Sequence, residues 1–462
     1  MTVSSVSDGR PLETGQAGAR SGYEHPSALR GHYALSCQVC GRELADDGLA
    51  LSCPESHEPG LLRTVYAAGR LSPWAGLAGL YRFGEWLPIV RTLPGAPGTV
   101  IYRGERLGRA LGLSRLWIAF SGYWPERGAD FPTGTFKDLE AYTVLGRLPD
   151  RCGPLVVASA GNTASAFGAA CTRHGRPCLL IVPAAALPGL ALREPLGPTV
   201  KLVVLDDADY TDAIAFAAEV ARLPGFQLEG GARNVGRRDG LATPMYAAVE
   251  EIGRLPDFYV QAVGSGVGAI AVHEAAGRLV AQAGPALPRL LLAQNRPFTP
   301  LFDAWRAGRA DLGPRDPETD RRDAARIGAR ELSNRFPPYG MVGGVRDVLR
   351  DSRGDVLVAG DEAARLAARM FADTEGIDVE AAVGVAVACL REAVAGGQIP
   401  PDATVLLHVT GGGRRRLGID VDLVDCVPAL RLGRSELSGE DVLARVEALF
   451  AAPAGSDLGD RS

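Results

Sequence analysis

The chain has 462 residues, of which 46% are hydrophobic and 22% charged, and its formal net charge is −5. This length allows two or three domains with a large buried core, and the ordinary composition excludes a disordered or fibrous protein. The charge gives no reason to expect a nucleic-acid partner, and neither a long apolar run nor a secretory signal is visible, so we expect a cytoplasmic protein without a membrane partner.

The amino-terminal part of the chain divides into two predicted segments. Residues 1–30 are polar and lack periodicity, which predicts a disordered tail. The next segment contains Cys37 and Cys40 in a C-x-x-C motif, then Cys53 and His57 at a spacing that is typical of zinc ligands. Four such ligands let a short segment fold around a structural zinc ion. The alternative is a degenerate zinc ribbon that holds no metal.

Short apolar runs alternate with helical stretches through the rest of the chain. The runs are rich in Val, Ile and Leu on both faces and are followed by Gly or Pro, as in the buried strands of a parallel sheet. The predicted strands are residues 154–160, 177–183, 200–206, 258–263, 289–295 and 404–410. This pattern predicts an α/β protein with mostly parallel sheets.

Lysine is almost absent from the sequence. Only Lys137 and Lys201 occur among 49 basic residues, and the others are arginines. Arginine supplies positive charge but cannot become an amine nucleophile. Lys201 lies in a predicted strand, where chance explains it, whereas Lys137 follows the glycine-containing turn 132–136. Lys137 is therefore the candidate reactive amine.

Two loops at the ends of predicted strands open helices and suit anions. In α/β folds ligands gather at these carboxyl ends. The first loop consists of Ser159, Ala160, Gly161, Asn162 and Thr163, and the second of Gly264, Ser265, Gly266, Val267 and Gly268. Free N–H groups at a helix start suit a carboxylate or a phosphate, although an ordinary helix cap is the alternative for the first loop. The second loop also resembles a dinucleotide fingerprint, but no acidic residue follows at the distance that a ribose requires.

A third loop begins with Thr410 and continues with three glycines, which let a flat ligand lie close to the backbone. An amine, an amide, a phosphate cradle and a hydroxyl together form the set of groups that pyridoxal phosphate requires. The segments that carry them resemble the threonine synthase group of fold type II pyridoxal-phosphate enzymes, which are tryptophan synthase β-like, and within that group the cysteate synthases. The similar stretches are residues 121–126, 136–141, 261–266 and 294–300, together with the Cys-rich ribbon.

The resemblance implies a role for each of these residues. Lys137 would form a Schiff base with the cofactor and then act as the acid and base at the substrate Cα. Asn162 would bind the phenolic oxygen of pyridoxal phosphate, the loop 264–268 its phosphate, and Thr410 its pyridine nitrogen. The loop 159–163 would hold the α-carboxylate of the substrate.

The resemblance also implies two α/β domains after a zinc-ribbon-like segment. The expected divisions are a disordered tail (1–30), the ribbon (31–66), a large cofactor-binding domain (67–145 and 255–450), a smaller domain (146–254) and a frayed tail (451–462).

The expected activity is a β-replacement by a homodimer that converts O-phospho-L-serine and sulfite to L-cysteate and phosphate. One alternative is a threonine synthase that acts on O-phospho-L-homoserine and water. Another is a non-catalytic homologue that acts as a binding protein, but such a protein has no reason to keep the lysine, both glycine-rich loops and the threonine.

Overall fold

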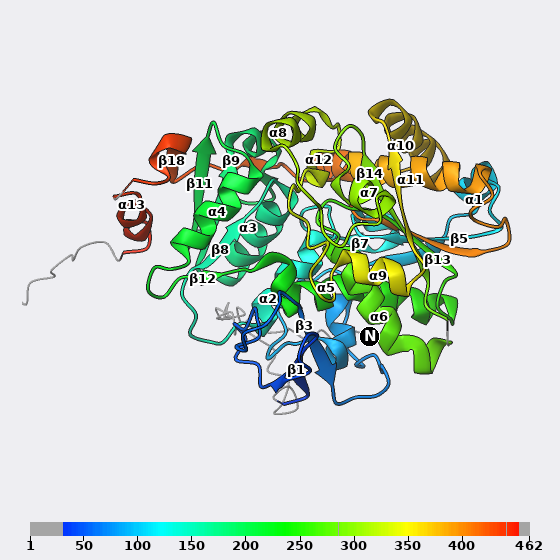
Figure 1. The fold of residues 1–462 in the computed structure, drawn as a ribbon, viewed down its shortest axis with the longest axis horizontal. Coiled ribbons are helices and arrows are strands. Elements are labelled where there is room, and N and C mark those ends of the chain that lie inside the picture. Colours follow the sequence, from blue (N-terminus) through cyan, green and yellow to red (C-terminus); the bar gives the residue numbers. More distant parts are fainter. Residues whose placement is uncertain (1–30, 285, 440, 452–462) are drawn as a thin grey trace, which may run out of the picture.

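Two parallel β-sheets form the centre of the computed structural model, which describes residues 31–284, 286–439 and 441–451 (Figure 1). The larger sheet consists of β4 (Val100–Arg103), β5 (Arg115–Phe120), β13 (Phe258–Ala262), β14 (Arg289–Asn295), β15 (Asp355–Ala359) and β16 (Thr404–Val409). Its order is β15-β14-β13-β16-β5-β4, and β4 alone pairs antiparallel in it.

The smaller sheet is parallel throughout. It consists of β8 (Leu155–Ala158), β9 (Cys178–Pro183), β11 (Val200–Asp206), β12 (Gln227–Leu228) and β18 (Leu430–Gly433). Its order is β12-β8-β9-β11-β18. The expected α/β class with mostly parallel sheets is thus confirmed, and each of the six predicted strands is present within about two residues of its predicted ends.

Helices cover both faces of each sheet. The central apolar cluster contains α2 (Lys137–Arg147), α3 (Asn162–His174), α5 (Val235–Ile252), α6 (Val267–Ala283) and α9 (Val345–Asp351). The outer face of the larger sheet is covered by α1 (Glu105–Leu111), α10 (Asp361–Glu375) and α11 (Ala381–Ala395), and that of the smaller sheet by α4 (Tyr210–Val220) and α13 (Val442–Ala448). Further elements are α7 (Pro300–Arg306), α8 (Pro317–Arg326), α12 (Arg414–Asp420), and two short antiparallel strand pairs, β6 (Tyr123–Trp124) with β7 (Ala129–Asp130) and β10 (Ala191–Leu192) with β17 (Val424–Asp425).

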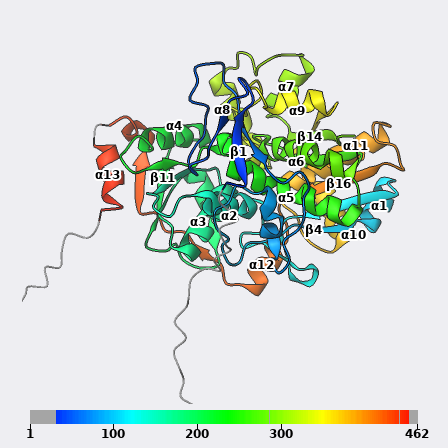
Figure 2. The same cartoon turned by 90° about the horizontal axis from the view of Figure 1, so that it is seen from below.

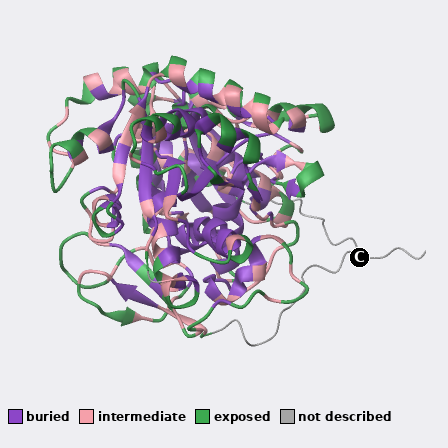
Figure 3. Ribbon diagram, turned by 90° about the vertical axis from the view of Figure 1, so that its right-hand side faces the viewer, coloured by how far each residue is buried: buried purple, intermediate pink, exposed green. Residues whose placement is uncertain are grey.

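The strands are apolar on both sides because both sides are buried. In β9, Leu180 and Val182 face the central cluster, while Leu179 and Ile181 face the outer cluster beneath α4. Buried residues accordingly fill the middle of the molecule, with exposed ones on its outer helices (Figure 3). Full burial of one such side chain contributes about 1.5–3 kcal/mol, so these strands supply much of the stability of the fold.

The carboxyl-terminal segment belongs to the smaller sheet. β18 pairs in parallel with β11, and Val442 and Val446 of α13 pack in the same apolar cluster as Leu432. The expected division assigned residues up to 450 to the large domain, whereas in the structure β18 of this segment completes the edge that β11 otherwise leaves open. The predicted tail at 1–30 and residues 452–462 of the predicted end lie outside the described residues.

A three-stranded antiparallel sheet of β1 (Tyr33–Cys37), β2 (Glu43–Leu44) and β3 (Leu62–Tyr66) forms the predicted ribbon segment. It lies against α2, α5 and α6 at the lower side of the molecule in Figure 1, and Figure 2 shows the same face from below. Thr64 and Tyr66 both donate to the buried carboxylate of Asp239 on α5, at 2.6 and 2.7 Å. The ribbon is therefore docked by buried polar contacts.

Among the described residues, no helix has the length and apolar character that a membrane crossing requires.

A buried ion pair joins the ribbon segment to α2. Arg147 donates through Nε and Nη2 to the two carboxylate oxygens of Asp46, both at 2.7 Å, and both side chains are at most 2% exposed. Burial alone would raise the pKa of Asp46, but the hydrogen bonds and charge of Arg147 hold it below its ordinary value.

We predict that Arg147→Met lowers the free energy of unfolding by about 3–5 kcal/mol, because it leaves a buried carboxylate without its partner. Urea denaturation at neutral pH measures this, and Arg222→Met, which removes an exposed partner of Glu219, should cost less than about 1 kcal/mol. Equal losses of the free energy of unfolding for Arg147→Met and Arg222→Met would contradict the assignment.

The lowered pKa of Asp46 also predicts a pH dependence. The ionised carboxylate stabilises the protein above about pH 4, and this contribution is lost as the pH falls. The free energy of unfolding of Asp46→Asn should therefore depend less on pH in the acid range.

Candidate active site

A cavity lies where the carboxyl ends of β8, β13 and β16 meet the amino ends of α2, α3 and α6. Every residue predicted for catalysis, cofactor binding or substrate binding lines it: Lys137, Ser159, Ala160, Gly161, Asn162, Thr163, Gly264, Ser265, Gly266, Val267, Gly268 and Thr410. The structure thus brings together loops that are far apart in the sequence. Their individual roles stay predictions.

The backbone fixes the position of Lys137, which is the first residue of α2. The N–H of Phe136 donates to the carbonyl oxygen of Thr410 at 2.8 Å, and the N–H of Gly412 donates to that of Gly134 at 3.1 Å. Gly134 has a φ of +72°, which favours glycine at this turn. The loop that carries the amine is therefore paired directly with the loop that carries the candidate partner of the pyridine nitrogen.

The amine of Lys137 lies in a mostly buried polar environment. Its Nζ donates to Oε2 of Glu140 at 3.1 Å, and the Lys137 side chain is 18% exposed while that of Glu140 is fully buried. Burial and the nearby charge of Arg237 lower the pKa of Lys137, and Glu140 opposes them without restoring the ordinary value. A lysine with a lowered pKa more readily supplies the unprotonated amine that a nucleophile or a base requires.

The helix start at α6 fits a phosphate. The 17-residue helix begins after Gly266, which has a φ of +75°, and no side chain caps it. The first N–H groups of a helix have no partner within it, so they are donors for an anion. A Cβ on Gly266 would lie 2.5 Å from Cγ2 of Val345, and one on Gly268 would lie 2.6 Å from Nε2 of Gln261. A side chain at either position would therefore displace a neighbouring side chain, and at Gly266 the positive φ also favours glycine.

The loop before α3 is held by Ser159, whose hydroxyl accepts from the N–H groups of Gly161 and Ala164, both at 3.0 Å. The side-chain amide of Asn162 projects into the cavity and donates to Oε2 of Glu380 at 3.0 Å. Burial, followed by the charge of Glu331, raises the pKa of Glu380 to about 8. At neutral pH Glu380 is thus largely uncharged and adds little negative charge to the cavity that is to hold a phosphorylated cofactor.

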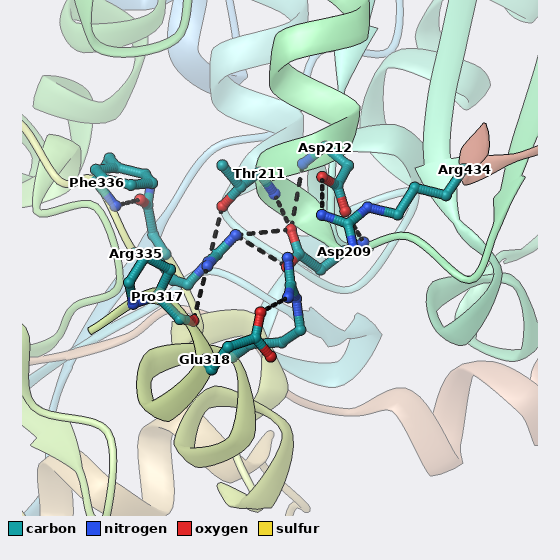
Figure 4. A network of polar contacts seen from close by, with 10 residues as sticks. Asp209, Thr211, Asp212, Pro317, Glu318, Arg335, Phe336 and Arg434 are labelled. Carbon is teal, nitrogen blue, oxygen red and sulfur yellow. Dashed lines mark hydrogen bonds and ion pairs between the residues drawn. The ribbon is translucent and has the colours of Figure 1, made fainter. Parts of the chain in front are cut away.

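A larger cavity of about 1120 Å³ adjoins this one, and Tyr210, Ser265 and Asn334 line both. Its wall is fastened by ion pairs at the start of α4 (Figure 4). Asp209 accepts from Nη2 of Arg335 at 2.9 Å and from Nε of Arg321 at 2.9 Å. The pairs link the start of α4, which follows β11 of the smaller sheet, to α8 through Arg321 and to the segment after α8 through Arg335.

The four predicted metal ligands meet in the ribbon. The ligand atoms of Cys37, Cys40, Cys53 and His57 all lie within 4.8 Å of one another, and Sγ of Cys40 and Sγ of Cys53 are 3.8 Å apart. Tetrahedral zinc with Zn–S bonds of about 2.3 Å places two sulfurs about 3.8 Å apart. Nδ1 of His57 lies 2.7 Å from the carbonyl oxygen of Glu58, which leaves Nε2 on the side of Cys37. This donor set fits a structural zinc ion.

Several residues of the site were not predicted from the sequence: Tyr210, Arg237, Glu331 and Glu380, which line the cavity, and Glu140, which contacts the amine of Lys137. Glu140 stands three residues after Lys137, which places both on one face of a helix, so its position carried a usable signal. The others come from distant segments whose local sequence has no distinguishing pattern.

Comparison with known proteins agrees with this geometry. Residues 127–411 match the family model described as pyridoxal-phosphate dependent enzyme. The chain is 45% identical to a cysteate synthase of Methanosphaerula palustris over 402 residues, which are 86% of this chain and 93% of that protein. It is also 45% identical to a cysteate synthase of Methanoculleus marisnigri over 430 residues, which are 92% of this chain and 98% of that protein.

Solved structures share the fold at low sequence identity. Diaminopropionate ammonia lyase from Escherichia coli superposes with a TM-score of 0.55 at 16% identity, covering 81% of this chain and 95% of that one. Maize serine racemase gives a TM-score of 0.53 at 18% identity, covering 70% and 89%. These likenesses concern the fold alone, whereas the similarity to the curated relatives extends over nearly their whole length. The chain belongs to the cysteate synthase family of fold type II pyridoxal-phosphate dependent enzymes.

Proposed function

We propose that this chain converts O-phospho-L-serine and sulfite to L-cysteate and phosphate, with pyridoxal phosphate as cofactor, and that it works as a cytoplasmic homodimer. The observation that carries the proposal is the cavity in which the amine of Lys137 faces the uncapped start of α6, in a chain 45% identical to cysteate synthases. The dimer is expected from the family.

The residues of the cavity fit the parts of the cofactor. The backbone N–H groups of the loop 264–268 would hold its phosphate, the amide of Asn162 its phenolic oxygen, and the hydroxyl of Thr410 its pyridine nitrogen. When bound, pyridoxal phosphate supplies a sink for the electrons released at the substrate Cα.

Lys137 would bind the cofactor and afterwards move the proton of the substrate Cα. The N–H groups of Asn162 and Thr163, at the start of α3, would hold the α-carboxylate and so orient the Cα–H bond toward the amine. In the net reaction the Cβ–O bond breaks, with its electron pair leaving on phosphate, and a Cβ–S bond forms from the lone pair of the sulfite sulfur. The replacement needs no oxidant or reductant.

We predict that Lys137→Arg abolishes both turnover and the visible absorption band of the bound cofactor, because a guanidinium keeps the charge but not the nucleophile. Borohydride reduction of the unmodified holoenzyme, followed by peptide mass spectrometry, should find the cofactor on Lys137. Lys201→Arg, on β11, is the matched control and should keep the band. Cofactor attached at Lys201 instead would refute the assignment of the site.

The substrate is tested by separate incubations with phosphoserine and phosphohomoserine, each with and without sulfite. The two differ by one methylene, which a pocket discriminates by only about 1–3 kcal/mol, so the chemistry must separate them. In phosphoserine the phosphate leaves from Cβ after one deprotonation, whereas phosphohomoserine needs a second deprotonation, at Cβ, to lose phosphate from Cγ. We expect sulfite-dependent phosphate release from phosphoserine, with cysteate identified by mass spectrometry. Efficient threonine formation without sulfite would establish a threonine synthase instead.

The ribbon is expected to hold about one zinc ion per chain, measured by elemental analysis of the purified protein. A Cys37→Ser and Cys40→Ser double variant should lose the metal and unfold at a lower temperature, because the ion replaces an apolar core in this segment. Turnover per folded molecule should fall less than stability, since none of the four proposed zinc ligands lines the cavity of Lys137. Cys152→Ser is the control and should keep its zinc. Stoichiometric zinc in the double variant would exclude the proposed ligands.

A further inference from the structure

A chain of buried charges runs from Lys137 away from the cavity. Glu140 receives the amine of Lys137 on Oε2, and its Oε1 lies 3.1 Å from Nη1 of Arg237. The same Oε1 accepts from the hydroxyl of Thr163 at 2.9 Å. Arg237 also donates through Nε to Glu229 at 2.8 Å, and a second contact joins these two side chains. Glu140 is the only one of these groups that contacts the amine among the hydrogen bonds of the described residues.

This arrangement joins three separate parts of the fold. Glu140 belongs to α2, Arg237 to α5, and Glu229 follows β12 at the edge of the smaller sheet. Two carboxylates and two basic groups alternate along this series, so their charges balance, although Glu140, Arg237 and Glu229 are buried and Lys137 is mostly buried. Unpaired charges are costly to bury, so each member holds its neighbours in place.

The contact with Thr163 links this series of buried charges to a second part of the site. Thr163 lies in the first turn of α3, in the loop expected to bind the substrate carboxylate. One carboxylate therefore touches both the amine and the substrate loop. A displacement of Glu140 would alter the two together.

We propose that Glu140 is a positioning residue: it fixes the amine of Lys137 through Oε2 and, through Oε1, ties that amine to Thr163 and to the charge of Arg237. The inference rests on the proposed role of Lys137 as the reactive amine. Glu140 holds the amine of Lys137 in one position at the wall of the cavity and governs how readily that amine gives up or takes a proton. Arg237 limits the effect of Glu140 on the amine, because its positive charge on the other side of Glu140 partly offsets the charge of the carboxylate.

Other titratable groups near the amine are few. Arg237 and Glu229 face it from beyond Glu140, with opposite effects on its protonation. Tyr210, at the start of α4, lies near Arg237, and Glu331 and Glu380 line the cavity from the larger sheet. Substitution of Glu140 alone removes the single carboxylate in contact with the amine and leaves the others unchanged.

Because Lys137 and Lys201 are the only lysines in the sequence, the reactivity of each amine can be measured separately. The full chain, freed of cofactor, is acetylated with trace acetic anhydride across a range of pH, and peptide mass spectrometry reports Lys137 against Lys201 as an internal reference in the same molecule. In Glu140→Gln the pKa of Lys137 should fall by about 1–3 pH units, because the amine loses its nearest anion while Arg237 stays. Glu140→Asp, which keeps the charge on a shorter stem, should restore part of the difference.

A matched control is Glu219→Gln, which removes the acidic member of an exposed pair at the same i, i+3 spacing and should leave the labelling of Lys137 unchanged. In the holoenzyme, Glu140→Gln should move the pH profile of kcat in the direction of the labelling shift. KM for phosphoserine should change less than kcat, because the amide oxygen of glutamine still accepts from the hydroxyl of Thr163. Circular dichroism and the reactivity of Lys201 verify that each variant is folded.

An unchanged labelling profile of Lys137 in folded Glu140→Gln would overturn the proposal, as would equal effects of Glu140→Gln and Glu219→Gln. Saturation with pyridoxal phosphate tests the proposed function separately, since the cofactor should protect Lys137 and not Lys201 from acetylation. Failure of that protection would refute the role of Lys137, whatever the effect of Glu140.

Discussion

Two backbone hydrogen bonds between distant parts of the chain fix the position of Lys137 in the cavity. They pair the turn before Lys137 with the glycine loop after β16, and α2 begins directly beyond them. A helix turns by about 100° per residue, so a slip of one position would rotate the lysine side chain away from the cavity. The glycines at 134 and 412 keep side chains out of this close approach, and a Cβ on Gly412 would meet the carbonyl oxygen of Asp378 at 2.8 Å. The fixed pairing explains how a single flexible side chain acquires a defined direction.

The sheets supply the second constraint, because their carboxyl ends must face one another. The cluster of apolar side chains between them contains residues of both sheets and of α2, α3, α5 and α6, so it holds the three loops at a common edge. Charged groups buried in this packing need partners, and three carboxylates have an arginine: Asp46 with Arg147, Asp239 with Arg278, and Glu140 with Arg237. Each pair joins different segments of the chain, so the same ion pairs that satisfy buried charge also fix the segments relative to one another.

The sequence was informative where local chemistry determines structure. Strands buried on both faces are continuous apolar runs, and the predicted ones are all present. β15 and β5 were missed although Asp355 and Arg115 stand only at their first positions and apolar runs follow, 356–359 and 116–120. Lys137 was identified by its rarity, and the Cys and His spacing predicted a cluster that the structure contains. Arg237, Glu331 and Glu380 reach the cavity only through tertiary packing, so their local sequence gives no sign of it. The pairing of β18 with the smaller sheet likewise depends on an open strand edge, which no local pattern predicts.

The ion pairs of the site fall into two groups that differ in the free-energy cost of separating the two charges. Glu140 and Arg237 are buried, and separating them leaves uncompensated charge in the interior, at a cost of about 3–5 kcal/mol. At the wall of the larger cavity, Asp209 and Arg321 are 25% and 30% exposed, and such partly solvated pairs are worth nearer to 1 kcal/mol. A replacement in which phosphate leaves before sulfite enters requires the amine to stay in place while one anion is exchanged for another. The buried pair beside the amine meets the first requirement, and the more exposed pair of Asp209 with Arg321 can part at a lower cost.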